Sequence, residues 1–103
     1  MDYNQTIQQL GGFGKLKAMV GAHTFIKHEA EKALSFKFKG SRKCNYIKIT
    51  LDASDTYNVE IGRVTNGKVK GFTYKVIDES AGIYCDQLKP LFESITGLYL
   101  SLT

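Results

Sequence analysis

Four segments in the middle of the chain alternate apolar and polar residues with a period of two, and this pattern constrains the fold most. They lie at residues 34–39, 46–51, 57–62 and 71–76, and residues 24–28 follow the pattern less closely. Because successive side chains of a β-strand point to opposite faces, each segment predicts a strand with one apolar face. The chain is therefore expected to form an antiparallel sheet of four or five strands, with an apolar face that needs a cover.

Two turn signals predict how these strands pair. The segment DASDT at residues 52–56 predicts a three-residue loop that places Ile49 opposite Val59. In that register the apolar residues of both strands share one face, so turn chemistry and hydrophobic pattern agree.

The second turn signal is the dipeptide Asn66-Gly67, which favours a type I′ hairpin because that turn needs positive φ at both positions. A two-residue loop at this point places Ile61 opposite Phe72. It also puts Tyr74 on the apolar face of the sheet.

Amphipathic segments before and after the strands predict the helices that cover the sheet. Residues 4–10 and residues 13–20 have helical spacing and are each followed by glycine. The last helix is expected to end at Gly97, with Pro90 in its first turns, where a missing N–H is tolerated. Its apolar stripe consists of Tyr84, Leu88, Leu91, Phe92 and Ile95.

Together these elements predict a single α+β domain over residues 1–103, an antiparallel β-meander with one face covered by N- and C-terminal helices. The composition, with 43% hydrophobic and 23% charged residues, is typical of a globular protein. No segment has the roughly 20 apolar residues that a membrane helix needs. The N-terminal MDYNQTIQQ lacks the basic and apolar parts of a signal peptide, which favours a cytoplasmic location with reduced thiols.

Candidate catalytic and metal-binding residues are few. Cys85, near the start of the last helix, is weighed as a reactive thiol served by His23 or His28, and the favoured alternative is a small buried thiol. These residues and Cys44 lack a zinc-ligand spacing, and GGFGK at residues 11–15 lacks the spacing of a phosphate-binding loop. We therefore predict a non-enzymatic protein without a metal or cofactor.

Basic residues gather on the predicted open sheet face and in the loop at residues 40–45. With one tyrosine among them they form a candidate binding surface: Lys37, Lys39, Arg42, Lys43, Tyr46, Lys48 and Lys75. A basic face with an aromatic residue is typical of nucleic-acid platforms. The alternative is that the lysines keep an open face soluble and prevent edge pairing.

The last residues form a second candidate surface. After Gly97 the chain alternates again, so the segment either folds back onto the domain or offers an apolar partner patch, made of Leu98, Tyr99, Leu100 and Leu102. The outer strands of the predicted sheet are edges, and pairing between them would give a homodimer.

Three groups of residues resemble a group of short uncharacterised proteins from bacteriophages and related mobile elements. They are TIQQLGG at residues 6–12, YIKITLD followed by DTYNVE at 46–52 and 55–60, and YCDQL leading to TGL at 84–88 and 96–98. The resemblance spans nearly the whole chain, but its motifs are core and turn residues and specify no chemistry.

The resemblance implies an accessory protein in the cytoplasm of a bacterial host. Small phage proteins of this kind bind host macromolecules, which makes a host protein or nucleoprotein complex the expected partner. The most concrete form of this hypothesis is a host-defence inhibitor that acts like an anti-CRISPR protein. The alternative is a nucleic-acid-binding protein that uses the basic sheet face.

Overall fold

The computed structural model describes residues 3–41, 43–67 and 71–98 of the chain. The elements follow in chain order: α1 (Tyr3–Gln9), α2 (Phe13–Val20), β1 (His23–His28), the 3₁₀ turn η1 (Glu29–Glu31), β2 (Ala33–Lys37), β3 (Tyr46–Leu51), β4 (Tyr57–Gly67), β5 (Gly71–Ile83), the 3₁₀ turn η2 (Cys85–Gln87) and α3 (Leu88–Thr96).

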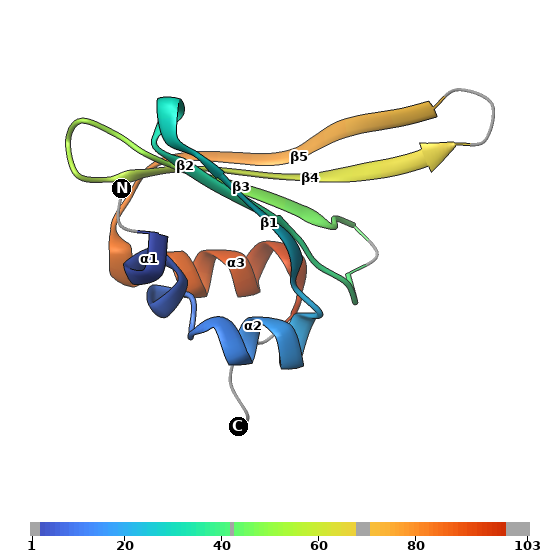
Figure 1. Ribbon diagram of the computed structural model, residues 1–103, viewed down its shortest axis with the longest axis horizontal. Helices are drawn as coiled ribbons and strands as arrows, with labels where there is room; N and C mark the ends of the chain where they lie inside the picture. The colour runs from blue at the N-terminus through green and yellow to red at the C-terminus, as the bar shows by residue number, and fades with distance from the viewer. Residues whose placement is uncertain (1–2, 42, 68–70, 99–103) are drawn as a thin grey trace.

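The five strands form one antiparallel sheet in the order β1-β2-β3-β4-β5, so each strand pairs with its neighbour in the sequence. The helices α1, α2 and α3 all lie on one face of this sheet (Figure 1). We call the opposite face the open face; it carries the polar alternate residues of β3 and β4, such as Lys48 and Glu60. The predicted α+β meander is confirmed, including the first strand, whose alternation is less regular.

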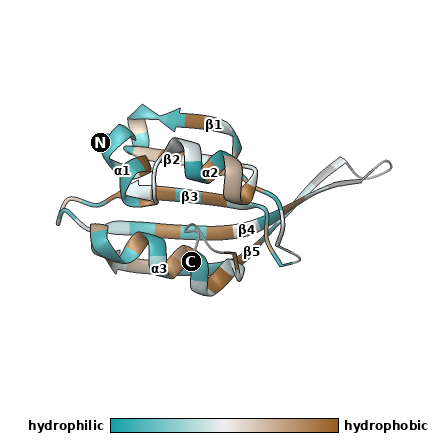
Figure 2. Cartoon of the chain, turned by 90° about the horizontal axis from the view of Figure 1, so that it is seen from below, coloured by the Kyte–Doolittle hydropathy of each residue, from teal (hydrophilic) through white to brown (hydrophobic). Residues whose placement is uncertain are grey.

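The core lies between the sheet and the helices, where Figure 2 shows hydrophobic segments of α3, β3 and β4. A row of aromatic rings joins β1, β2 and α3. Phe25 stacks on Phe36 with ring centres 4.9 Å apart, and Phe38 meets Phe92 edge to face at 5.0 Å. Such pairs add to the stabilisation that burial of their area provides.

Glycines end two of the helices, as the sequence predicts. Gly21 has a φ of 61° and donates its N–H to the Lys17 carbonyl, and Gly97 has a φ of 74° and donates to Glu93. Pro90 is the third residue of α3, which confirms a helix start close to it. In the described part of the chain, no helix is long and apolar enough to cross a membrane.

The predicted apolar stripe of the last helix needs one correction. Leu88 and Phe92 are buried, and Leu91 and Ile95 pack partly against the core. Tyr84, however, is 62% exposed, because the chain reaches α3 through the turn η2 instead of one continuous helix.

The C-terminal segment can be placed only in part. Leu98 packs against the core, close to Gly40, so it belongs to the folded domain. Tyr99, Leu100 and Leu102 lie outside the described residues, and the patch that we predict there stays a prediction.

The register predicted for the first turn is confirmed. Ile49 lies opposite Val59, and Leu51 lies opposite Tyr57. The Asp52 N–H closes the loop on the Thr56 carbonyl at 2.8 Å.

The two-residue turn predicted between β4 and β5 is wrong. Gly67 pairs with Gly71 as a step of the ladder, and Ile61 lies opposite Asp78 instead of Phe72. The connection between the strands falls at residues 68–70, outside the described residues.

Strand pairing and burial far from the turn explain why the tight turn favoured by Asn66-Gly67 does not form. The observed register pairs β5 as far as Ile83, which lies opposite Tyr57 and packs against the core. In the predicted register residues 77–83 would have no strand partner and this apolar packing would be absent. The register also shifts beside Ile61 and Gly62, which places a β-bulge in the ladder.

Candidate functional site

The open face carries charges of both signs. Lys48 on β3 forms an ion pair with Glu31 of the turn η1. The hydrogen bond and the charge of Lys48 lower the pKa of Glu31, and the bond to Glu31 raises the pKa of Lys48. Both groups therefore stay charged, and the carboxylate of Glu31 balances the charge of Lys48, so this part of the face is not a purely basic platform.

A tyrosine cluster covers the middle of the open face. The Tyr74 hydroxyl donates a hydrogen bond to the Glu60 carboxylate at 2.7 Å, and the Tyr74 ring meets Tyr46 edge to face at 5.4 Å. Burial, followed by the neighbouring Glu60 carboxylate, raises the pKa of Tyr74. Tyr74 thus lies on the open face and not on the apolar face that the predicted hairpin gives it.

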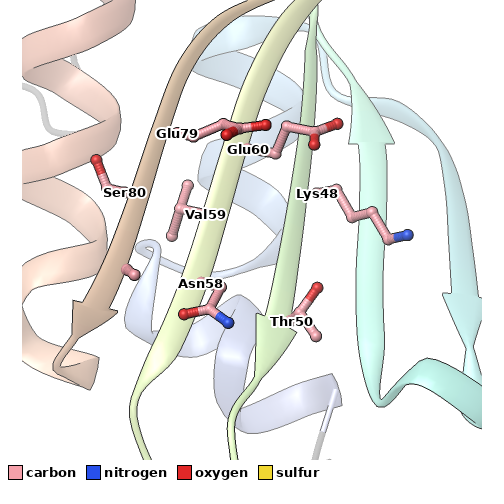
Figure 3. A pocket seen from close by; sticks show the side chains of 8 residues that line it. Lys48, Thr50, Asn58, Val59, Glu60, Glu79 and Ser80 are labelled. Carbon is pink, nitrogen blue, oxygen red and sulfur yellow. The ribbon is translucent and has the colours of Figure 1, made fainter.

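A shallow hollow of about 470 Å³ lies beside this cluster (Figure 3). It is lined by Lys48, Thr50, Asn58, Val59, Glu60, Glu79, Ser80 and Ala81. Glu60 and Glu79 are cross-strand partners, so two carboxylates meet at its rim. No group of three or more metal-ligating side chains occurs among the described residues.

The structure separates the basic residues that the sequence places together. Lys37 and Lys48 lie on the open face with Tyr46, while Lys39 packs against Gly21 at the end of α2. Lys43 is exposed in the loop before β3, and Arg42 lies outside the described residues.

Lys75 is the clearest correction among these residues. It is the strand neighbour of Tyr74, which lies on the open face, so Lys75 points to the other side of β5. The prediction that Lys75 lies on the open face is wrong because it assumes a hairpin register that the structure does not have.

The structure also corrects the interpretation of the cysteine. Cys85 is exposed in η2 after β5, so the favoured interpretation as a buried thiol is wrong. His23 and His28 belong to β1, at the opposite edge of the sheet from β5. They are therefore not placed to accept a proton from Cys85. His28 instead hydrogen-bonds Ser35, whose side chain is buried.

β4 and β5 extend beyond the rest of the sheet as a two-stranded ribbon, which projects away from the helices in Figure 1. β3 accompanies β4 only as far as Gly62, which pairs with Tyr46. We call residues 63–67 of β4 and 71–76 of β5 the arm. In the described ranges no third strand pairs with it.

The arm and its connection carry charges of one sign only. Residues 63–76 contain four basic residues and no acidic one: Arg63, Lys68, Lys70 and Lys75. Arg63 and Lys75 are cross-strand partners, so their side chains share one face of the arm. The sequence contains this signal, but the short predicted hairpin hides that Arg63 and Lys75 belong to a projecting ribbon.

One side chain holds the base of the arm. The Asn45 amide donates to the Val64 carbonyl at 2.8 Å and accepts from the Val64 N–H at 2.7 Å. Its backbone N–H donates to Gly62 and its carbonyl accepts from Phe38. The hydrogen bonds of the Asn45 side chain thus extend the β3–β4 ladder by one residue pair beyond Tyr46 and Gly62.

Asn45→Ala is expected to lower the free energy of unfolding by about 1–2 kcal/mol, because it removes two partly buried hydrogen bonds. Urea unfolding measures this decrease, and amide exchange at Val64 should become faster. Asn58→Ala, on the exposed part of β4, is the control and should stay within about 0.5 kcal/mol of the parent chain. Equal effects of the two substitutions would contradict the role of Asn45.

Comparisons with protein-family models, curated proteins and solved structures found no match to this chain. The function is therefore inferred from the surfaces of the molecule itself.

Proposed function

We propose that this chain is a non-enzymatic binding protein that inserts its arm into the major groove of double-stranded DNA. The observation that carries the proposal is the projecting basic ribbon, residues 63–67 and 71–76, with its connection.

The charge of the arm supports an anionic partner. Arg63 and Lys75 lie directly opposite each other, and like charges at such positions repel. A phosphate group bound on the face that Arg63 and Lys75 share would be within reach of both cations. Neutralising phosphates also releases counterions, which is the main source of sequence-independent affinity for DNA.

The shape of the arm supports a duplex in preference to a single strand. A two-stranded antiparallel ribbon fits the major groove of B-DNA, which is about 12 Å wide. Single strands are usually held by aromatic side chains on which bases stack. On the arm, the contacts of Tyr74 with Tyr46 and Glu60 hold it on the open face, while Lys75 points to the other side, so this ring and the basic pair do not form one stacking platform.

Removing two cations from the arm should weaken DNA binding. We expect Arg63→Gln combined with Lys75→Gln to lower the affinity for a duplex about tenfold at low salt. The slope of log K against log salt concentration should become shallower by about 1.8, or about 0.9 for each phosphate that is no longer neutralised. Fluorescence anisotropy of a labelled duplex at several salt concentrations measures both quantities.

The matched control removes the same charge elsewhere. Lys15→Gln with Lys17→Gln, two exposed positions on α2, should leave the affinity close to that of the parent chain. If Lys37→Gln with Lys48→Gln weakens binding instead, the open face is the contact surface and the arm proposal fails. Absence of binding at low salt, or preference for single strands, would also overturn it.

The resemblance to phage proteins supports a second candidate, a host protein or nucleoprotein as partner and inhibition of a host defence system as the outcome. Pull-down from bacterial lysate should then recover one protein in stoichiometric amount. The exposed Val76 and Ile77 on β5 offer apolar contacts for such a partner. Repeated recovery of no stoichiometric partner would speak against this candidate.

A further inference from the structure

The residues of the open face form three rows that run across β3, β4 and β5. The members of each row are cross-strand partners: Lys48 with Glu60 and Glu79, Tyr46 with Gly62 and Val76, and Val64 with Tyr74. Cross-strand partners share one face of a sheet. The Tyr74 hydroxyl binds Glu60, so the first and third rows lie on the same face. The open face therefore has a charged row directly beside two apolar rows.

The two apolar rows are open to contact with another molecule. Tyr74 is 45% exposed and Val76 is 42% exposed. Gly62 carries no side chain, and the Tyr74 ring lies against it. Exposed apolar side chains that lie together, with polar residues around them, are typical of surfaces that bind another protein.

The charged row carries more negative than positive charge. Lys48 forms its ion pair with Glu31, which lies outside the row. Glu60 accepts the hydrogen bond of Tyr74, and Glu79 forms no ion pair within the part of the chain that the structure describes. Because Glu60 and Glu79 lie directly opposite each other, a cationic group bound between them would be within reach of both carboxylates.

A hollow gives a long side chain access to these two carboxylates. The β4–β5 ladder has two register shifts, one between Tyr57 and Val59 and one between Ile61 and Gly62. Bulges of this kind bend a strand and increase its twist. The hollow of about 470 Å³ is lined by residues 58–60 of β4 and 79–81 of β5, so it lies at the first of these shifts (Figure 3).

We propose that the open face binds an amphipathic helix of a partner protein, with an arginine of that helix at Glu79 and apolar side chains on Tyr74 and Val76. The inference names the surface and the partner chemistry for the second candidate function, a host protein as partner, and rests on that candidate. It does not depend on DNA binding, since Arg63 and Lys75 lie on the other side of the arm.

The spacing of the rows fits a helix that lies on the sheet. Side chains two residues apart on one face of a strand are separated by about 6.7 Å, and side chains four residues apart on a helix by about 5–6 Å. An arginine and an apolar residue four positions apart in a helix therefore reach the charged row and the neighbouring apolar row together. Helices already cover the opposite face of this sheet (Figure 1).

The charge of the surface selects a basic helix over an acidic helix or a nucleic acid. Carboxylates repel phosphate groups and acidic side chains, so Glu60 and Glu79 disfavour both. A guanidinium group presents five N–H donors in a planar fork and can bond to carboxylates on two sides. Arginine is therefore favoured over lysine at this position.

Selection from a displayed library of helical peptides, randomised on one face, tests the proposal without nucleic acid. The parent chain is the bait, and counter-selection on the Glu79→Arg chain removes peptides that bind elsewhere. We expect the recovered peptides to carry an arginine three or four positions from leucine, isoleucine or phenylalanine. A synthetic, labelled copy of one recovered peptide then gives the affinity by fluorescence anisotropy.

Variants of the charged row and the apolar rows test the contacts. Glu79→Gln should weaken binding of this peptide about tenfold, because it removes the charge that the arginine meets. Val76→Ser should weaken it as well. The Glu79→Arg chain should bind a peptide with glutamate in place of the arginine. Glu29→Gln, an exposed position beside β1, is the matched control and should leave the affinity unchanged, with thermal unfolding confirming that all variants fold.

Three results would overturn the proposal. They are no enrichment of any peptide, recovered peptides without a basic residue, and an affinity that Glu79→Gln leaves unchanged. Competition between duplex DNA and the peptide would also contradict it, because the two are assigned to different sides of the molecule. A host protein that the parent chain and the Glu79→Arg chain recover equally would support the second candidate function and reject this surface.

Discussion

Phe92→Ala is expected to lower the free energy of unfolding by about 3–5 kcal/mol, the largest effect predicted for a single substitution in this chain. The Phe92 ring is 1% exposed and packs edge to face on Phe38, so its removal leaves a cavity between α3 and the sheet. Domains of this size are stable by about 5–15 kcal/mol, so the variant is expected to be close to unfolding. Urea unfolding at low temperature measures the difference.

Two further variants show that the effect comes from packing in the core. Phe92→Leu keeps most of the volume and should cost clearly less than Phe92→Ala. Ser94→Ala, on the exposed side of the same helix, should change stability by no more than about 0.5 kcal/mol. A Phe92→Ala variant as stable as Ser94→Ala would contradict the packing described for α3.

Gly62→Ala is the second large effect, with an expected decrease of about 1–3 kcal/mol in the free energy of unfolding. A Cβ at this buried position would lie 2.5 Å from Tyr74 Cε1 and 2.7 Å from the Lys75 carbonyl oxygen. The tyrosine can move only by giving up its bond to Glu60, and the carbonyl belongs to the β5 backbone. The substitution should therefore displace the base of the arm.

A second substitution distinguishes the clash with the Tyr74 ring from the clash with the Lys75 carbonyl oxygen. Tyr74→Ala in the Gly62→Ala chain should recover part of the stability, since it removes the ring but not the Lys75 carbonyl. Gly14→Ala is the matched control, because an added Cβ on the exposed face of α2 meets no atom within 4 Å. Alanine favours a helix over glycine, so this control should be neutral or stabilising by up to about 1 kcal/mol. Destabilisation of both variants to the same degree would contradict the close packing at Gly62.

The secondary structure was largely predictable because its signals are local. The alternating segments correspond to β2, β3, β4 and β5, and the glycines at 21 and 97 end the helices before and after the sheet. The β3–β4 register was predictable as well, since a three-residue loop leaves little freedom in how Ile49 and Val59 meet.

The candidate binding surfaces were less predictable, because they depend on one register. The basic residues are all visible in the sequence, but Lys75 joins Arg63 only when β4 and β5 pair beyond Gly62. The turn at Asn66 and Gly67 is a strong local preference, yet it competes with pairing and burial that reach as far as Ile83. Together these long-range contacts stabilise the fold more than one favourable turn does. They cannot be recognised from residues that are neighbours in the sequence.

The order of residues along the chain is enough to establish the α+β class, the meander and the side of the sheet that is covered, because hydrophobic periodicity assigns faces wherever the strand register is local. Three features emerge only in the folded molecule: the basic arm of β4 and β5, the place of Tyr74 on the open face, and the exposure of Cys85 and Tyr84. The first two follow from the long-range pairing between β4 and β5, and the third from the turn η2 between β5 and α3. A shift in register changes the partner of every residue along the strand, including those that carry the charges, and therefore decides which side chains share a surface.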